Sequence, residues 1–88
     1  MKTQIDYYYR DEKILIEEIQ KSVRENVAAE YIRWRKEKNM TQAELAMRAG
    51  ISRSNISRFE SGTYNPSLEM MVKIASALDM NIEINLIK

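Results

Sequence analysis

Residues 41–62, TQAELAMRAGISRSNISRFESG, contain two short helical patterns separated by one glycine, Gly50. Thr41 and Glu44 have capping-box spacing, which predicts that a helix begins there. Gly50 supplies a turn that most other residues resist, and Ser52 is suited to cap the next helix. The inner face is apolar and consists of Leu45, Ala46, Ala49, Ile51, Ile56 and Phe59. The outer face of the second helix instead carries arginine, serine and asparagine, where a merely solvated helix more often carries Glu and Lys.

Upstream of this stretch, no glycine or proline interrupts residues 1–49. Apolar residues recur there every three or four positions, which predicts one helical stripe: Ile16, Ile19, Val23, Val27, Tyr31 and Trp34. We expect two helical segments, the second starting at Ser22, because Ser22 and Glu25 also have capping-box spacing. One long helix over about residues 11–38 is the alternative. Residues 1–10 suit either a strand, since Ile5, Tyr7 and Tyr9 alternate, or a frayed terminus.

Downstream, Asn39 is expected to end a helix in the left-handed conformation. Pro66 suits the first turn of a fourth helix, whose apolar face we predict to be Leu68, Met71, Val72, Ala75 and Leu78. From Met80 the period changes to two, with Ile82, Ile84 and Leu86 on one face, so we expect a strand. Since a lone strand is unstable, its partner is either residues 5–9 or the same strand of a second chain. We favour the two-fold dimer.

The composition excludes several classes of function. The 88 residues include no cysteine and no histidine, which removes thiolate chemistry, the commonest general base and the usual zinc ligands. The carboxylates form no recognisable constellation with a nucleophile, so we expect no enzyme, no metal and no cofactor. No apolar run reaches membrane-spanning length, and the N-terminus has no apolar signal core. We therefore expect a cytoplasmic protein.

The charge is unevenly distributed although the net charge is only +1. Residues 31–66 hold seven Lys/Arg and three Asp/Glu, whereas residues 1–30 hold five and seven. A basic centre between acidic ends is consistent with nucleic-acid binding, although a mixed-charge solvated surface is its commoner cause.

Two helices joined by a glycine-containing turn match the DNA-binding helix-turn-helix. From about Val27 to Leu78 the sequence resembles the Cro/C1-type (XRE) repressor domain, through Arg35, the stretch 41–62 and the later PSLEMMVKIASAL. The resemblance implies a mainly α fold, a lambda-repressor-like bundle. We divide the chain into an N-terminal helical extension (1–25), the DNA-binding domain (26–79) and a C-terminal dimerisation strand (80–88). Asn39 and Asp79 stand where the family usually has glycine.

The resemblance also assigns roles to residues, because the family's third helix lies in the major groove. Arg53, Ser54 and Arg58 are expected to contact bases, since arginine can donate two hydrogen bonds to guanine. Expected phosphate contacts lie at the helix ends and flanks: Thr41, Gln42, Ser52, Asn55, Ser57, Ser61 and Thr63. Arg35 and Glu60 match a family pair that forms a salt bridge and orients the third helix. The expected DNA target is a near-palindromic operator.

The ends of the chain resemble those of HigA- and HipB-type antitoxins, most clearly where a fourth helix runs directly into a strand, ALDMNIEINLIK. This resemblance implies a dimer that neutralises a small basic toxin, such as a HigB/RelE-like ribonuclease, and represses its own operon. The toxin would bind the acidic N-terminal segment, through Tyr8, Asp11, Glu12, Ile16 and Glu17. Two alternatives remain open: that segment only extends the core, or the protein is a stand-alone repressor of phage or restriction-controller type without a toxin.

Overall fold

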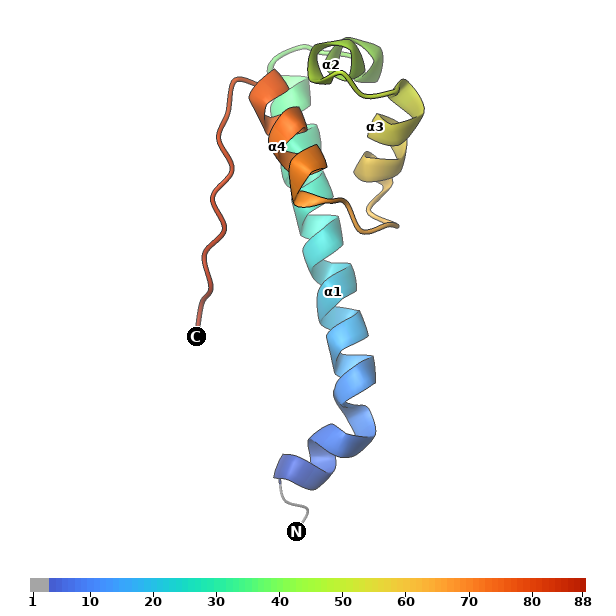
Figure 1. Cartoon of the computed structure of the whole chain (residues 1–88), viewed down its shortest axis with the longest axis vertical. Coiled ribbons are helices and arrows are strands. Elements are labelled where there is room, and N and C mark those ends of the chain that lie inside the picture. The colour runs from blue at the N-terminus through green and yellow to red at the C-terminus, as the bar shows by residue number, and fades with distance from the viewer. Residues whose placement is uncertain (1–3) are drawn as a thin grey trace.

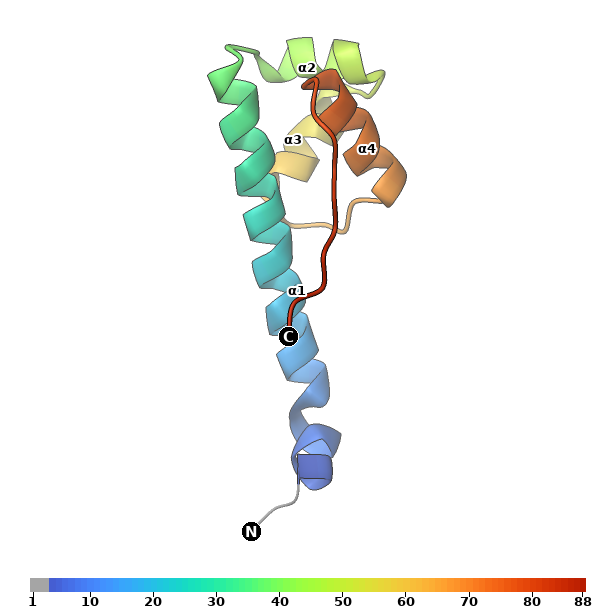
Figure 2. The same ribbon diagram turned by 90° about the vertical axis from the view of Figure 1, so that its left-hand side faces the viewer.

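A computed structural model of the chain describes the backbone of residues 4–88 and the side chains from residue 15 onward. Its four helices are α1 (Gln4–Glu37), α2 (Gln42–Ala49), α3 (Arg53–Ser61) and α4 (Leu68–Ala77). The three short helices gather against the C-terminal half of α1, whose N-terminal half projects away from them (Figures 1 and 2). The molecule therefore combines a small globular bundle with a protruding helical arm.

The long helix α1 differs from the sequence prediction in two respects. It is continuous through Ser22, so the predicted break there is wrong. Serine lowers helix propensity only slightly, and the segment contains neither glycine nor proline, so nothing forces an interruption. Of the two readings left open for residues 1–10, the strand is wrong for residues 5–9, because α1 already includes these residues. The alternative of one long helix is thus the correct one.

The caps of α2 and α3 confirm the pattern read from residues 41–62. The Thr41 side chain accepts a hydrogen bond from the Glu44 backbone N–H, and the Glu44 side chain accepts one from the Thr41 backbone N–H. Ser52 caps α3 by accepting from the backbone N–H of Asn55. Gly50 and Asn39 have φ of 68° and 56°, the left-handed region expected of both turns.

The core lies where α2, α3 and α4 meet the C-terminal half of α1. Its fully buried side chains are Leu45, Ile56, Ile74 and Leu78. Phe59 is also buried, and its ring meets that of Tyr31 edge-on, with centroids 4.8 Å apart. These contacts hold α3 against α1 and fix the direction in which its outer face points.

The structure of α4 differs from the sequence prediction in two respects, namely where the helix begins and which residues face the core. It begins at Leu68 with Ser67 as N-cap, so Pro66 precedes the helix and does not occupy its first turn. Leu68 and Val72 are 61% and 49% exposed, while Ile74 is completely buried. The predicted inner face is confirmed for Met71, Ala75 and Leu78 and wrong for Leu68 and Val72. The reason is that α4 is apolar on more than one side, and only packing decides which side is covered.

Residues 80–88 run as an extended segment alongside α1 without pairing as a strand anywhere in the described chain (Figure 1). Ile82 packs against the core, whereas Ile84 and Leu86 are 64% and 97% exposed. The described fold is therefore all-helical, and the predicted strand is not formed within one chain. A strand needs a hydrogen-bonding neighbour, and residues 5–9 are helical. None of the described helices is both long and apolar enough to cross a membrane.

Candidate nucleic-acid interface

The outer face of α3 is polar and exposed because its inner face is held in the core. Ile56 and Phe59 are buried on one side of the helix, and Arg53, Ser54 and Ser57 are exposed. The first turn of α3 contains no acidic residue, so the partial positive charge of its N-terminus is not neutralised there. This face therefore offers donors and positive charge to an anionic surface.

Arg58 lies one turn from the α3 N-terminus and does not point freely into solvent. Its guanidinium carbon is 4.9 Å from the centroid of the Tyr64 ring, in a cation–π arrangement. Tyr64 is held in turn, because its hydroxyl donates a hydrogen bond to Met70 Sδ on α4. The loop after α3 thereby restricts Arg58 to a preferred direction.

The hydroxyl groups at the helix ends are partly engaged in local contacts. The Thr41 and Ser52 oxygens accept the capping hydrogen bonds of α2 and α3, and Ser52 Oγ also lies 3.2 Å from Ser54 Oγ. Ser61 Oγ donates to the Arg58 carbonyl oxygen at 2.6 Å and lies 2.7 Å from Thr63 Oγ1. All five of these hydroxyl-bearing residues are exposed, while Asn55 is half-buried. A phosphate contact from these side chains would be made in addition to their present local hydrogen bonds and would not replace them.

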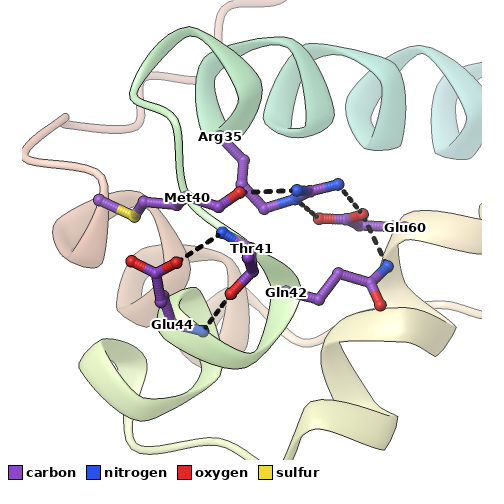
Figure 3. A network of polar contacts seen from close by, with 6 residues as sticks. All are labelled: Arg35, Met40, Thr41, Gln42, Glu44 and Glu60. Carbon is purple, nitrogen blue, oxygen red and sulfur yellow. Dashed lines mark hydrogen bonds and ion pairs between the residues drawn. The ribbon is translucent and has the colours of Figure 1, made fainter.

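Arg35 and Glu60 form a two-point ion pair that joins α1 to α3 (Figure 3). Arg35 Nε and Nη2 donate to the two Glu60 carboxylate oxygens at 2.7 and 3.0 Å. The two side chains are only 12% and 6% exposed. Arg35 Nη1 also donates to the Met40 carbonyl oxygen at 2.8 Å, so the same guanidinium fixes the turn that leads into α2.

Gln42 belongs to this network as well. Its Nε2 donates to Glu60 Oε1 at 3.0 Å, and its carbonyl oxygen points away from Glu60 (Figure 3). The side chain was predicted to contact a phosphate, but the structure directs it to the carboxylate that anchors α3. Gln42 therefore links the start of α2 to α3. The sequence had not indicated this contact, because the two residues are 18 positions apart.

A helix-turn-helix family model matches residues 32–85, more than half of the chain. The chain belongs to the helix-turn-helix family of Cro/C1 (XRE) type. The matched range covers α2, α3 and α4 together with the end of α1 and most of the C-terminal segment. The polar face of α3 therefore lies on the second helix of a helix-turn-helix.

Relatives of this helix-turn-helix chain are regulators. An uncharacterised transcriptional regulator of Archaeoglobus fulgidus is 51% identical over 45 residues, covering 51% of this chain and 63% of the relative. The cryptic phage CTXphi transcriptional repressor RstR of Vibrio cholerae is 45% identical over 49 residues, covering 56% of this chain and 44% of the repressor. The chain thus spans only part of the length of either relative.

A solved structure resembles the fold closely. The restriction-modification controller protein C.AhdI from Aeromonas hydrophila superposes with a TM-score of 0.66 at 30% identity, covering 68% of this chain and 91% of that one. These relatives confirm the predicted helix-turn-helix bundle and the expectation that the chain is not an enzyme. The three relatives are named as a regulator, a repressor and a controller, and none of the three is named as an antitoxin.

The residues predicted to bind a toxin are only partly described. Tyr8, Asp11 and Glu12 lie outside the residues whose side chains the structure describes. Ile16 and Glu17 are exposed on the projecting part of α1, so residues 15–19 do not extend the core of a single chain. Gln20 on α1 contacts the loop after α3, because its Nε2 donates to Asn65 Oδ1 at 2.7 Å. This contact lies ahead of the domain boundary predicted at residue 26.

Proposed function

We propose that this helix-turn-helix protein is a sequence-specific DNA-binding transcriptional repressor that acts without a toxin partner. The observation that carries the proposal is the exposed polar face of α3, held in place from behind by the half-buried Arg35–Glu60 pair. Regulators and phage repressors among its relatives support the same function. The proposed ligand is double-stranded DNA.

Arg53 and Arg58 have the chemistry to read base edges in the major groove. Each guanidinium can donate two hydrogen bonds to the O6 and N7 acceptors of one guanine. Ser54 between them accepts or donates, and so discriminates little. The stacking of Arg58 on Tyr64 reduces the number of side-chain conformations that are lost on binding.

Backbone contacts would set the register of the domain on DNA. Thr41, Ser52, Asn55, Ser57, Ser61 and Thr63 remain the proposed phosphate contacts, with Gln42 restricted by its hydrogen bond to Glu60. Such contacts add affinity without sequence preference. Their loss is expected to weaken binding to all duplexes alike.

We further propose that the protein binds as a two-fold dimer, so that its operator is nearly palindromic. Helix-turn-helix dimers contact half-sites about one helical turn apart, roughly 34 Å. Ile82, Ile84 and Leu86 are the residues proposed to pair with the same segment of a second chain. The unpaired, extended state of residues 80–88 supports this, because such an edge is open to strand addition.

Selection of bound duplexes from a random pool tests the function, followed by titration of the best duplex with Arg53→Ala. We expect a loss of about 5- to 150-fold, equivalent to about 1–3 kcal/mol, and relaxed preference at one base pair. Arg33→Ala is the charge-matched control, because Arg33 is exposed on α1 and pairs locally with Glu30. No enrichment of any sequence, or equal losses for both variants, would reject the proposal.

The antitoxin function keeps one supporting observation, namely the exposed apolar residues on the projecting part of α1. It predicts that a small basic protein encoded beside this gene co-purifies with the chain. It also predicts that deletion of residues 1–20 abolishes neutralisation while leaving DNA binding intact. Retention of neutralisation after this deletion would remove the N-terminal segment from the toxin site.

A further inference from the structure

The loop after α3, residues 62–67, carries the tyrosine that lies against Arg58 but has little support of its own. Within the described part of the chain, residues 63–66 take part in no backbone–backbone hydrogen bond. The hydroxyl end of Tyr64 is held by Met70, which does not fix the backbone that carries the ring. A segment with so few backbone contacts opens easily, so its position depends on side chains from other elements.

Arg24 on α1 supplies such contacts on both sides of Tyr64. Its Nε donates to the Gly62 carbonyl oxygen at 3.3 Å, and its Nη1 donates to Asn65 Oδ1 at 3.1 Å. Gln20 donates from Nε2 to the same Asn65 oxygen at 2.7 Å. Since Gln20 and Arg24 are four positions apart, they lie on one face of α1. Together they tie the loop to the middle of the long helix.

The end of α3 lies against the same part of α1. Gly62 is buried, and a Cβ added there would be 3.5 Å from Glu25 Cα and 3.8 Å from Ala28 Cβ. The Arg24 guanidinium stands at the C-terminal end of α3, where the partial negative charge of the helix favours a cation. Figures 1 and 2 show the chain leaving α3 beside the middle of α1. The loop therefore starts from a fixed point on α1.

The charge of Arg24 is not committed to a carboxylate in the described part of the chain. The ion pairs found there do not include Arg24, although Glu30 and Glu83 line the same groove. Its side chain is half-buried. Removing this guanidinium therefore strands no partner charge, in contrast to removal of Arg35. The role of Arg24 in placing the loop can be separated from the stability of the domain.

We propose that Arg24, together with Gln20, is a positioning residue for DNA recognition, which acts on Arg58 through Asn65 and Tyr64. The two α1 side chains fix the loop, the loop fixes the tyrosine ring, and the ring restricts the guanidinium that reaches the bases. Both α1 residues precede the range 32–85 that the family model matches. The inference rests on the proposed repressor function, and it makes base recognition depend on a part of α1 outside that range.

NMR spectroscopy of the full chain without DNA tests the first step. The ring current of Tyr64 shifts the side-chain resonances of Arg58, and Tyr64→Leu removes this shift. Arg24→Met keeps an unbranched side chain without donors, and it should move the Arg58 resonances toward those of Tyr64→Leu. Lys21→Met is the matched control, because it removes one positive charge from a 69% exposed side chain of α1. Arg58 resonances that stay unchanged in Arg24→Met would overturn the proposal.

Fluorescence-anisotropy titration of the duplex selected by the parent tests the second step. Arg24→Met should lower the affinity by about two- to fivefold, as expected for Tyr64→Leu, whereas Lys21→Met should bind like the parent. The double variant of Arg24→Met and Tyr64→Leu should bind no more weakly than Tyr64→Leu alone, because both changes release the same guanidinium. Losses that multiply, or an Arg24→Met variant that binds like the parent, would overturn the proposal.

The salt dependence of the affinity separates positioning from a direct phosphate contact. A side chain that neutralises one phosphate contributes about one unit to the slope of log affinity against log salt concentration. Arg24→Met should therefore keep the slope of the parent. A slope reduced by about one unit would assign Arg24 to the DNA backbone and overturn the proposal.

Asn65→Ala tests the same contacts from the loop side and leaves α1 unchanged. It should reproduce the loss of affinity and relax the preference at the base pair that Arg58→Ala affects, with unchanged helical circular dichroism. Equal losses for all duplexes in both Arg24→Met and Asn65→Ala would indicate a structural role only and overturn the proposal.

These outcomes are separable from those of the proposed repressor function. A parent that selects a duplex, with an Arg24→Met variant that binds it equally well, would reject the positioning role alone. A parent that selects no duplex would reject the repressor function and with it any role of Arg24 in recognition, whereas the NMR shifts would still report whether Arg24 holds the loop.

Discussion

At the scale of single residues, Arg35 and Glu60 connect three parts of the domain that are distant in sequence. The pair joins α1 to α3, and its members also hold Met40 and Gln42. Removing one partner leaves a buried charge without a counter-charge, which costs more than the net contribution of the intact pair.

We therefore expect Glu60→Ala to lower the free energy of unfolding by about 3 kcal/mol, measured by urea denaturation. Glu69→Ala is the control, because Glu69 is paired with Lys73 at 3.2 Å while 78% exposed. Its loss should cost less than about 1 kcal/mol. A Glu60→Ala variant as stable as the parent would show that the pair does not anchor α3.

Tyr64 is expected to act on DNA affinity through Arg58, as a positioning residue. Replacing Tyr64 with leucine removes the ring beneath the guanidinium, and cation–π contacts at exposed sites contribute about 0.5–1 kcal/mol. Operator affinity should fall by a factor of about 2–5, whereas Tyr64→Phe should retain it. An equal loss in both variants would assign the effect to the hydroxyl instead.

Tyr31 should make the stability depend on alkaline pH. Burial raises the pKa of Tyr31 above its usual 10.0, so the unfolded chain loses this proton at lower pH than the folded one. The contribution to stability is complete below about pH 10 and is lost as the pH rises through the folded pKa. Urea denaturation between about pH 7 and pH 11 should show a decline that is smaller in Tyr31→Phe. This variant also loses the hydrogen bond to the Met71 carbonyl oxygen, about 1 kcal/mol at neutral pH.

At the scale of elements, the turn between α2 and α3 depends on the left-handed conformation of Gly50. A Cβ added there would meet no atom within 4 Å, so the cost of a side chain is conformational alone. Gly50→Ala should destabilise the domain by about 1–2 kcal/mol. Gly50→Asn should cost less, because asparagine already adopts φ of 56° at Asn39 in this chain. Thermal melting of both variants measures the difference, and equal costs would contradict the backbone argument.

The elements also show where local sequence signals reach their limit. Capping residues and left-handed turns at residues 39–62 were predicted correctly because they involve contacts within a few positions. The capping-box spacing at Ser22 predicted a break that does not exist, since the same residue types are tolerated inside a helix. Leu68 and Val72 were misplaced because an apolar pattern does not say which of two apolar sides is covered.

At the scale of the whole molecule, the proposed two-fold dimer makes a prediction about operator spacing. Two recognition helices fixed relative to each other can enter successive major grooves only when the half-sites lie about one helical turn apart. Inserting about half a turn of DNA between the half-sites should reduce affinity nearly to that of a single half-site. Gel-shift titration of both duplexes measures this, and affinity that does not change with spacing would contradict a rigid dimer.

The helix-turn-helix and the residue types of its outer face could be predicted from the amino-acid sequence, since the periodicity, caps and glycine turn of residues 41–62 are local properties. The family resemblance also indicated the Arg35–Glu60 pair. The contact of Gln42 with Glu60 and the position of Arg58 over Tyr64 became visible only in the folded chain. The same holds for the exposure of Ile16, Ile19 and Val23 on α1. These features arise from packing between segments that are distant in sequence. A local sequence pattern does not indicate which surfaces that packing covers.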